Sequence, residues 1–430
     1  MKRRLWKVAT SLTLIVVVAL GARLIYAWEQ ERNTPANLVG LVPFVQETGN
    51  IAFSLALGQG YGSPYWQETG PTAWLTPVYP VLVAGAYRVF GIHTPHAFFA
   101  MALLNILFSA GTCVPIFYIG KRLGGAGVAS GAAWLWAVLP DAIIIPYQWI
   151  WDTSLSALLL ATILWATLEL AETQRLRDWC GYGLLWGFAL MTNPALGSLL
   201  PFFLGWAAYR AWKQGQLHVS RPALAIGIAV LCCVPWTVRN YVVFHRFIPL
   251  RSTFPLELWL GNNDYFDPES NIAPPANPAR EEVHEYIRMG ETAFMDDKWR
   301  KAVRFITTHP KLEAELYGRR FVETWTGMAE PVEGFRDADS PVVRVVLISN
   351  TLAAIGTLFG ILALLRARSA YAFPLLIGPI VYPLVYYATH ASLRYRHPLD
   401  PVLMLLTAVA IAWLCAALRR GRNVAPPQST

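Results

Sequence analysis

The sequence has little charge: only 14% of its 430 residues are Asp, Glu, Lys or Arg, whereas a soluble domain is usually about 25% charged. Cysteine is scarce too. The five cysteines form no CxxC pattern, so neither a disulfide framework nor a zinc site is expected. The sequence also contains no glycine-rich phosphate loop, no GxGxxG, no HExxH and no GxSxG motif. Nucleotide-driven chemistry and zinc hydrolysis therefore have no support in the sequence.

Long apolar runs dominate what is present, since 55% of the residues are hydrophobic. About 20 apolar residues form a helix that crosses the roughly 30 Å hydrocarbon core of a membrane. The sequence therefore predicts an all-α integral membrane protein, a polytopic bundle of about ten or eleven transmembrane helices. The first span runs from Trp6 to Trp28, which is too long for the core of a cleaved signal peptide. The other clear spans are expected at about 97–120, 125–147, 153–171, 181–193, 196–212, 222–241, 343–365, 371–388 and 399–418.

Basic residues indicate which side of the membrane each loop occupies, because Lys and Arg collect in short cytoplasmic loops. They stand in short tracts at span ends, which explains the net charge of +8 without a nucleic-acid partner. Placing these tracts inside puts the first outer loop, 29–74, outside, together with a long polar segment further on. This solution requires either that the short piece Leu75–Phe90 is horizontal or re-entrant, or that another break lies elsewhere.

The chain therefore divides into four parts. They are an N-terminal transmembrane region (1–241), an extracytoplasmic helical loop (242–342), C-terminal transmembrane helices (343–418) and a cytoplasmic tail (419–430). The extracytoplasmic loop is expected to form a small helical cap on the outer face. Mixed apolar and charged spacing predicts cap helices over Glu281–Met295, Trp299–Thr308 and Leu312–Trp325.

Two acidic residues stand at the outer ends of spans, where catalysis is possible. Glu47 lies in the first outer loop between apolar flanks, and partial burial would raise its pKa into the range that suits a general base. The alternative is a solvated loop glutamate. Asp152 opens the span at 153–171 and is either the N-cap of that helix, a position that Asp favours, or a second active-site acid.

Arginine is the second group that gathers at these span ends. Its planar guanidinium makes bidentate, charge-assisted contacts with phosphate, including the phosphate of a lipid. One alternative is anchoring at the membrane interface beside Trp and Tyr. Another, for Arg394 and Arg396, is pairing with acidic residues of the cap, which are Glu313, Glu315 and Glu323. The candidate residues for substrate and lipid-phosphate binding are Arg239, Asn240, Arg251, Asn262, Asn263, Arg394 and Arg396.

Four stretches combine these residues in one order along the chain. They are Glu47-x-x-Asn-Ile-Ala with Gly58-Gln-Gly-Tyr61, Gly70-Pro-Thr-Ala-Trp with Pro77-Val-Tyr-Pro80, Pro235-Trp-x-x-Arg-Asn-Tyr241 with Leu258-Trp-Leu-Gly-Asn-Asn263, and Arg394-Tyr-Arg-His-Pro398. In this order and placement the chain resembles the GT-C glycosyltransferases. It is most similar to bacterial proteins of the dolichyl-phosphate-mannose–protein mannosyltransferase type (glycosyltransferase family 39). The likeness covers nearly the whole chain.

The resemblance implies transfer of a sugar from a polyprenyl-phosphate carrier to an acceptor outside the cytoplasmic membrane, in a single inverting displacement. It also implies membrane-parallel helices in the first outer loop, which carries the catalytic acid. That acid is usually Asp, but this loop contains no Asp; Glu47 is the nearest acid and Glu68 a second candidate. Asp152 matches the family's second acid. The positions that bind lipid phosphate in such proteins match Arg239, Arg394 and Arg396.

The sequence thus predicts a membrane glycosyltransferase of the cytoplasmic (inner) cell membrane with extracytoplasmic long loops and no metal or cofactor. Its partners would be a polyprenyl-phosphate sugar donor, an acceptor that is a glycan, lipid or protein, and the lipid bilayer. The alternatives are a polytopic transporter or flippase, and a non-catalytic GT-C-like assembly partner. Transporters commonly show matching halves and ionisable groups at mid-membrane. Here the halves do not match, and the acids and arginines gather at one face.

Overall fold

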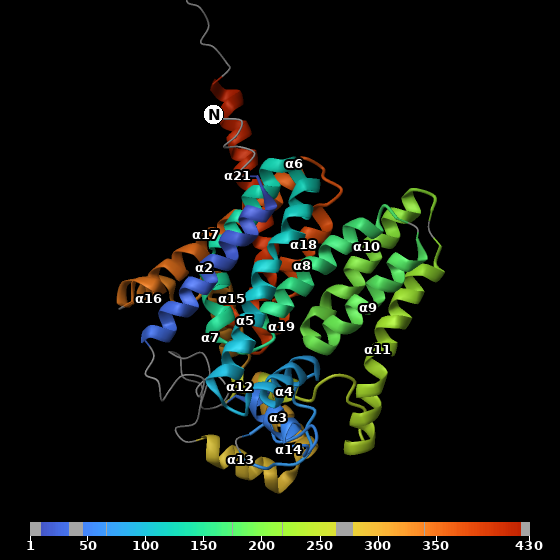
Figure 1. Ribbon diagram of the computed structural model, residues 1–430, viewed down its shortest axis with the longest axis vertical. Helices are drawn as coiled ribbons and strands as arrows, with labels where there is room; N and C mark the ends of the chain where they lie inside the picture. Colours follow the sequence, from blue (N-terminus) through green and yellow to red (C-terminus); the bar gives the residue numbers. More distant parts are fainter. Residues whose placement is uncertain are drawn as a thin grey trace, which may run out of the picture.

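Figure 1 shows the computed structural model, a bundle of long helices with shorter helices gathered at one end. The structure describes residues 10–33, 46–65, 67–173, 175–216, 218–263, 278–338 and 340–422. Within these residues the β-type pairing is limited to an isolated bridge between Gly62 and Pro71, so the predicted all-α class is confirmed. The predicted start of the first span at Trp6, part of the first outer loop (34–45) and the end of the tail (423–430) lie outside the described residues.

Six of the described helical stretches are apolar and at least 18 residues long, enough to cross a membrane. They are Leu12–Asn33 (α2), Pro95–Val138 (α5 and α6), Thr153–Leu170 (α8), Ser220–Phe244 (α11), Pro341–Arg366 (α17) and Leu393–Arg419 (α20, η3 and most of α21). The chain is therefore a multi-pass membrane protein. The number predicted from the sequence, about ten or eleven, is larger because the remaining apolar elements are shorter than this length and because one stretch contains two predicted spans.

That stretch is Pro95–Val138, in which the chain turns back on itself. Its elements are α5 (Pro95–Gly111) and α6 (Cys113–Val138), and α7 (Pro140–Gln148) follows. Helical geometry is lost inside α6 at Gly124 (φ −160°) and Gly125 (φ 73°), and a positive φ favours glycine. A Cβ atom on Gly120 would lie 2.7 Å from the Cα atom of Ala129. The two halves of α6 therefore pack side by side across this turn, which separates the two predicted spans.

The shorter apolar elements border the cap end of the bundle or cross part of it. They are α4 (Val78–Phe90), α9 (Leu176–Thr192), η2 (Pro194–Leu199), α10 (Leu200–Lys213), α18 (Ala372–Val381) and α19 (Leu384–Ala388). α9 ends at Asn193, whose backbone is extended (φ −142°, ψ 102°) and whose next residue, Pro194, has no N–H for continuing the helix. Irregular backbone at membrane depth is tolerated where it lines a cavity.

The polar segment forms helices, as predicted. They are α12 (Phe254–Gly261), α13 (Pro278–Met289), α14 (Glu291–Thr308), α15 (Pro310–Thr326) and α16 (Pro331–Asp337). One boundary differs from the prediction: the break falls at Gly290 (φ 75°), where glycine tolerates a backbone that ends a helix. The charged residues between the two predicted helices continue α14 instead, because Lys301 and Asp297 form an i,i+4 ion pair of 2.6 Å along it.

The first outer loop and the cap share a hydrophobic core of their own. Ile51 of α3 (Glu47–Ala56) and Trp74 pack with side chains of three cap helices. The ring centroids of Trp74 and Tyr286 lie 5.9 Å apart, and those of Tyr286 and Phe294 lie 5.4 Å apart. Loop and cap therefore form one unit at the end of the bundle opposite the C-terminal end of α21 (Asp400–Arg422) (Figure 1).

Candidate active site

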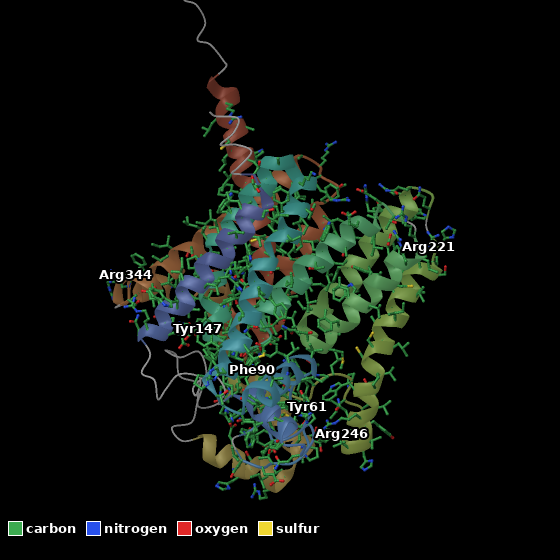
Figure 2. The ribbon with its side chains drawn as sticks, in the orientation of Figure 1. Tyr61, Phe90, Tyr147, Arg221, Arg246 and Arg344 are labelled. Atoms are coloured by element: carbon green, nitrogen blue, oxygen red, sulfur yellow. The ribbon has the colours of Figure 1, made fainter. Side chains whose placement is uncertain are left out.

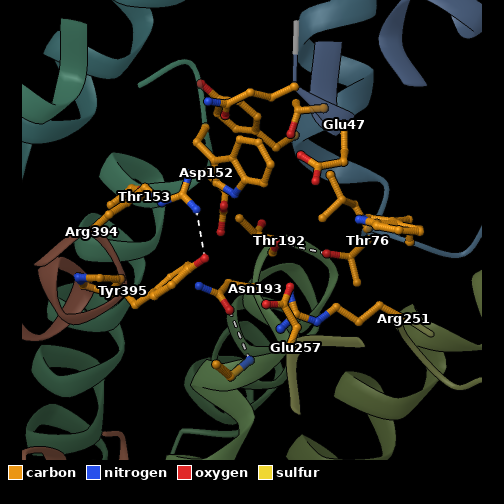
Figure 3. A pocket seen from close by; sticks show the side chains of 18 of the residues that line it. Glu47, Thr76, Asp152, Thr153, Thr192, Asn193, Arg251, Glu257, Arg394 and Tyr395 are labelled. Carbon is orange, nitrogen blue, oxygen red and sulfur yellow. Dashed lines mark hydrogen bonds between the residues drawn. The ribbon is translucent and has the colours of Figure 1, made fainter. Parts of the chain in front are cut away.

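A cavity of about 420 Å³ lies where the first outer loop, the cap and the bundle meet. Four predicted site residues line it although they come from four separate segments: Glu47, Asp152, Arg251 and Arg394. Figure 3 shows their side chains around one space. The structure therefore brings together two carboxylates and two guanidinium groups at one end of the bundle.

Glu47 is the first residue of α3, and its carboxylate faces the cavity (Figure 3). Desolvation at the cavity wall raises the pKa of this carboxyl; the charge of Glu257 also raises it, and the charge of Arg394 partly opposes the shift. A raised pKa brings a carboxylate closer to the basicity that proton abstraction needs. The surroundings of Glu47 therefore differ from those of a solvated loop glutamate. Glu68, the second candidate in the loop, is exposed and lines no part of this cavity.

Asp152 occupies the N-cap position of α8, but its side chain makes no capping hydrogen bond. Its Oδ2 accepts a hydrogen bond of 2.9 Å from Ser156 Oγ, which in turn accepts one of 3.2 Å from Asn193 Nδ2. Asn193 is itself oriented, since its Oδ1 accepts from the backbone N–H of Ala195 at 3.1 Å. This relay holds the carboxylate at the cavity. Desolvation raises the pKa of Asp152, against the opposing charges of the two cavity arginines.

Arg394 is held among aromatic rings on the short helix α20 (Leu393–Arg396). Its guanidinium carbon lies 4.6 Å from the ring centroid of Trp149 and 4.9 Å from that of Trp151, distances typical of cation–π contacts. Its Nη2 donates to the hydroxyl of Tyr395 at 3.0 Å (Figure 3). Arg251 lies on another wall, in the linker between α11 and α12. An anion in the cavity would therefore have guanidinium groups on separate walls.

The cavity also contains Glu257 of α12 and His390 of the α19–α20 loop, which were not predicted as site residues from the sequence. His390 Nε2 lies 3.4 Å from Glu257 Oε2 and 3.0 Å from the Tyr395 hydroxyl. Burial lowers the pKa of His390, and the charge of Glu257 opposes this shift. A signal existed for Glu257, because it is the single charged residue of the otherwise apolar helix Phe254–Gly261.

Arg239 lies outside the cavity and supports the first outer loop. Its Nη1 donates to the carbonyl oxygen of Thr72 at 2.6 Å and its Nη2 to that of Tyr61 at 2.7 Å. The guanidinium carbon also lies 5.0 Å from the ring centroid of Trp236. Its neighbour Asn240 is buried and donates to the carbonyl oxygen of Ile248 at 3.0 Å.

Asn262 and Asn263 hold the end of α12. Asn262 Nδ2 donates to the carbonyl oxygen of Ala388 at 2.9 Å, and its Oδ1 accepts from Arg320 Nη2 at 3.0 Å. Asn263 Nδ2 donates to the carbonyl oxygen of Trp259 at 2.9 Å. Asn262 thus joins the cap to the end of α19, and neither asparagine side chain lines the cavity.

Arg396 is buried and does not line the cavity. Its Nε lies 2.9 Å from Asp400 Oδ1, its Nη1 donates to the carbonyl oxygen of Thr324 at 3.0 Å, and its Nη2 donates to Asn350 Oδ1. The ion-pair partner of Arg396 is therefore Asp400 and not one of the cap acids. The side chains placed in the framework around the cavity, instead of on its wall, are Arg239, Asn240, Asn262, Asn263 and Arg396. We keep Arg251 and Arg394 as the candidate phosphate-binding residues.

A known protein family matches the part of the chain that contains several cavity residues. The model of the dolichyl-phosphate-mannose-protein mannosyltransferase family matches residues 74–238, a stretch that begins at cavity-lining Trp74 and contains Asp152 and Asn193. The resemblance predicted from the sequence is confirmed. No curated protein sequence matches the chain.

Solved structures match nearly the whole chain. The oligosaccharyltransferase of Archaeoglobus fulgidus in complex with Zn and sulfate has a TM-score of 0.55 at 13% identity, covering 95% of this chain and 49% of that chain. AglB from the same organism, in complex with an inhibitory peptide and a dolichol-phosphate, has a TM-score of 0.53 at 12% identity, covering 99% and 53%. The chain thus spans about half the length of that protein. The predicted GT-C fold is confirmed.

ArnT from Cupriavidus metallidurans, bound to undecaprenyl phosphate, also matches. The match covers 96% of this chain and 81% of that chain at 15% identity. The TM-score of this match is 0.40.

Proposed function

We propose that this chain is a membrane glycosyltransferase that moves a sugar from a polyprenyl-phosphate-linked donor to an acceptor hydroxyl. One observation carries the proposal: Glu47, Asp152, Arg251 and Arg394 converge on one cavity at the end of the bundle. A transfer of this kind needs a base for the acceptor proton and cations for the phosphate that leaves. Both groups of residues are present, and the matching family and fold support the same class of reaction.

In the proposed reaction, Glu47 accepts the proton of the acceptor hydroxyl as its oxygen attacks the anomeric carbon of the donor sugar. The bond between that carbon and the phosphate oxygen breaks, and the leaving lipid phosphate gains negative charge. Arg251 and Arg394 stabilise this charge from separate walls. Asp152, held by the Ser156 relay, orients the acceptor. One displacement inverts the anomeric centre.

The donor class is supported by chemistry and by one relative. The cavity lies at the ends of apolar helices, so a phosphate bound there can keep its prenyl chain in the membrane. AglB of Archaeoglobus fulgidus has been solved with a dolichol-phosphate, which is a polyprenyl phosphate, and with an inhibitory peptide. For this chain we propose an acceptor with a free hydroxyl group, carried by a glycan, a lipid or a protein.

We further propose that the cap faces outward from the cytoplasmic membrane. Arg221, near the start of α11, and Arg246, just beyond its end, lie at opposite ends of the bundle, with Arg246 on the cap side (Figure 2). Lys213, the last residue of α10, and Arg221, in the first turn of α11, flank the short linker between these helices, as expected at a cytoplasmic loop. A cysteine introduced at Arg300 in the cap should react with an impermeant thiol reagent in intact cells; protection from that reagent would reverse the orientation.

The decisive experiment supplies labelled polyprenyl-phosphate sugars to cell membranes that contain the protein and its acceptor. The wild type should convert the donor to free polyprenyl phosphate and a labelled acceptor. Glu47→Gln should reduce the rate by about 100-fold or more, whereas Glu68→Gln, an exposed acid of the same loop, should not. Equal rates for wild type and Glu47→Gln would remove Glu47 as the base.

Binding of unlabelled undecaprenyl phosphate tests the phosphate site without knowledge of the sugar. Arg251→Ala and Arg394→Ala should each weaken it by about tenfold or more, because each removes a charge-assisted contact. A wild-type protein that moves the lipid-linked sugar between leaflets unchanged would support the transporter alternative. One that neither binds polyprenyl phosphate nor consumes any donor would overturn the proposal.

A further inference from the structure

A hairpin of the first outer loop leads into one wall of the cavity. Residues 61–65 and 67–72, here called the 61–72 hairpin, are joined by the bridge between Gly62 and Pro71. Ser63 N donates to Gly70 O at 2.8 Å, and Thr72 N donates to Tyr61 O at 3.2 Å. Directly after it, the chain runs into cavity-lining residues 74–76. The position of the two hairpin ends therefore determines the position of cavity-lining residues 74–76.

Two charged side chains, Arg239 and Glu291, hold the two ends of the 61–72 hairpin together. Arg239 donates to the carbonyl oxygens of Tyr61 and Thr72, one on each side of the hairpin. Glu291, the first residue of α14, accepts hydrogen bonds from the hydroxyl of Thr72 and from Ala73 N, the latter at 2.8 Å. Arg239 donates to carbonyl oxygens of the hairpin, whereas Glu291 accepts from the hydroxyl and N–H groups at its end. Together they satisfy the carbonyl oxygen of Thr72 and the N–H of Ala73, which would otherwise be buried without partners.

Glu291 also contacts the segment that carries Arg251. Its Oε1 accepts from Ser252 Oγ at 2.7 Å, and its Oε2 accepts from the Tyr286 hydroxyl at 2.7 Å. Ser252 N in turn donates to Ala73 O at 2.9 Å. A single carboxylate, only 5% exposed, thus links the hairpin, the α11–α12 linker and the cap.

We propose that Glu291 is a positioning residue, which fixes Arg251 and the wall at Trp74 in one arrangement across the cavity. Ser252, which the carboxylate holds, is the residue next to Arg251, and Ala73 is the residue next to Trp74. Four neutral donors occupy the carboxylate, and Glu291 does not line the cavity, so it does not contact the substrate directly. Its effect on substrate therefore passes through Arg251. This inference rests on the proposed function, because it assumes that Arg251 holds the lipid phosphate.

Two substitutions separate the effect from loss of the fold. In Glu291→Gln the amide oxygen can still accept from Ala73 N and Ser252, and the amide nitrogen faces two hydroxyl groups, of Thr72 and Tyr286, that can turn to accept. In Glu291→Ala all four donors lose their acceptor. The matched control is Glu285→Gln, a cap glutamate whose partners are Lys298 and Lys301.

The test is a double-mutant cycle on the affinity for undecaprenyl phosphate in nanodiscs, with the thermal unfolding midpoint measured for each variant. Glu291→Ala should weaken binding by about tenfold in the wild-type background and by less than about twofold in an Arg251→Ala background, because coupled residues are not additive. Glu291→Gln should fall between wild type and Glu291→Ala, and Glu285→Gln should bind as the wild type does.

The outcomes distinguish this inference from the proposed function. If Arg251→Ala alone binds as tightly as the wild type, the phosphate role of Arg251 fails, and with it both the proposed function at this residue and the inference. If Arg251→Ala is weak but Glu291→Ala binds normally, only the inference fails. An equal loss from Glu291→Ala in both backgrounds also overturns it, since Glu291 then acts on the fold and not through Arg251.

Discussion

Gly261→Ala adds one methyl group at the end of α12, and the structure gives its cost. A Cβ atom at this position would lie 1.7 Å from the carbonyl oxygen of Thr389, whereas real Cβ contacts stay beyond 3.0 Å. The obstacle is backbone, so α12 and the α19–α20 loop must separate by at least about 1.3 Å. Overpacking of this kind costs about 3 kcal/mol, the upper part of the usual range, because no flexible side chain can move away.

The separation would also disturb the cavity. Glu257 and His390 stand on the two sides of this junction, 3.4 Å apart, and Arg320 joins the same sides through the carbonyl oxygens of Gly261 and Ala388. A displacement of 1 Å at an active site can cost about 100-fold in rate. We therefore expect Gly261→Ala to lower both the unfolding midpoint and the rate of sugar transfer, by about 100-fold for the rate.

The matched control is Gly227→Ala in α11, where a Cβ atom meets no atom within 4 Å. Replacing an unhindered helical glycine by alanine stabilises a helix by up to about 1 kcal/mol. Both variants add the same methyl group, so the difference between their unfolding midpoints and transfer rates measures the effect of the clash with Thr389. A Gly261→Ala protein that unfolds and transfers like Gly227→Ala would refute the reasoning.

Three further predictions concern the charges around the cavity. Because desolvation raises the pKa of Glu47 above its usual 4.5, the transfer rate should fall with decreasing pH already above that value, and a kcat–pH profile that stays level down to pH 4.5 would contradict Glu47 as the base. Ser156→Ala removes the 2.9 Å hydrogen bond to Asp152; it should raise KM for the acceptor and leave KM for the donor unchanged, and steady-state kinetics with each substrate varied would show whether both change. Arg396→Met removes the buried ion pair with Asp400 and leaves His397, 2.9 Å away, as the remaining partner of that carboxylate, so it should destabilise the protein by about 3 kcal/mol; an unfolding midpoint equal to that of the wild type would contradict this.

Much of the bundle was predictable because long apolar runs have few other structures available in a membrane. Gly124 and Gly125 fall at the predicted boundary between two spans, and they are the residues at which helical geometry is lost. The break at Gly290 was placed wrongly by several residues. Mixed spacing does not reveal a single positive φ, and the ion pair of Asp297 with Lys301 continues the helix through the predicted gap.

The site was partly predictable for a different reason. Acids and arginines at the predicted outer ends of spans are few, so Glu47, Asp152 and Arg394 could be selected from the sequence. Arg239 and Arg251 could not be distinguished in this way, because both lie near the same end of α11. Only the folded chain brings the 61–72 hairpin, more than 160 residues away in sequence, onto the guanidinium of Arg239.

The rings around Arg394 have a consequence for measurement. A guanidinium already held against the rings of Trp149 and Trp151 loses little rotational freedom when it meets an anion, so the binding site is preorganised. An arriving phosphate would draw positive charge away from two indole faces. The fluorescence of these tryptophans should then change as the site fills, and a chain with Trp149→Phe and Trp151→Phe should lose that change. Intrinsic tryptophan fluorescence would then report phosphate binding at this site without any labelled lipid.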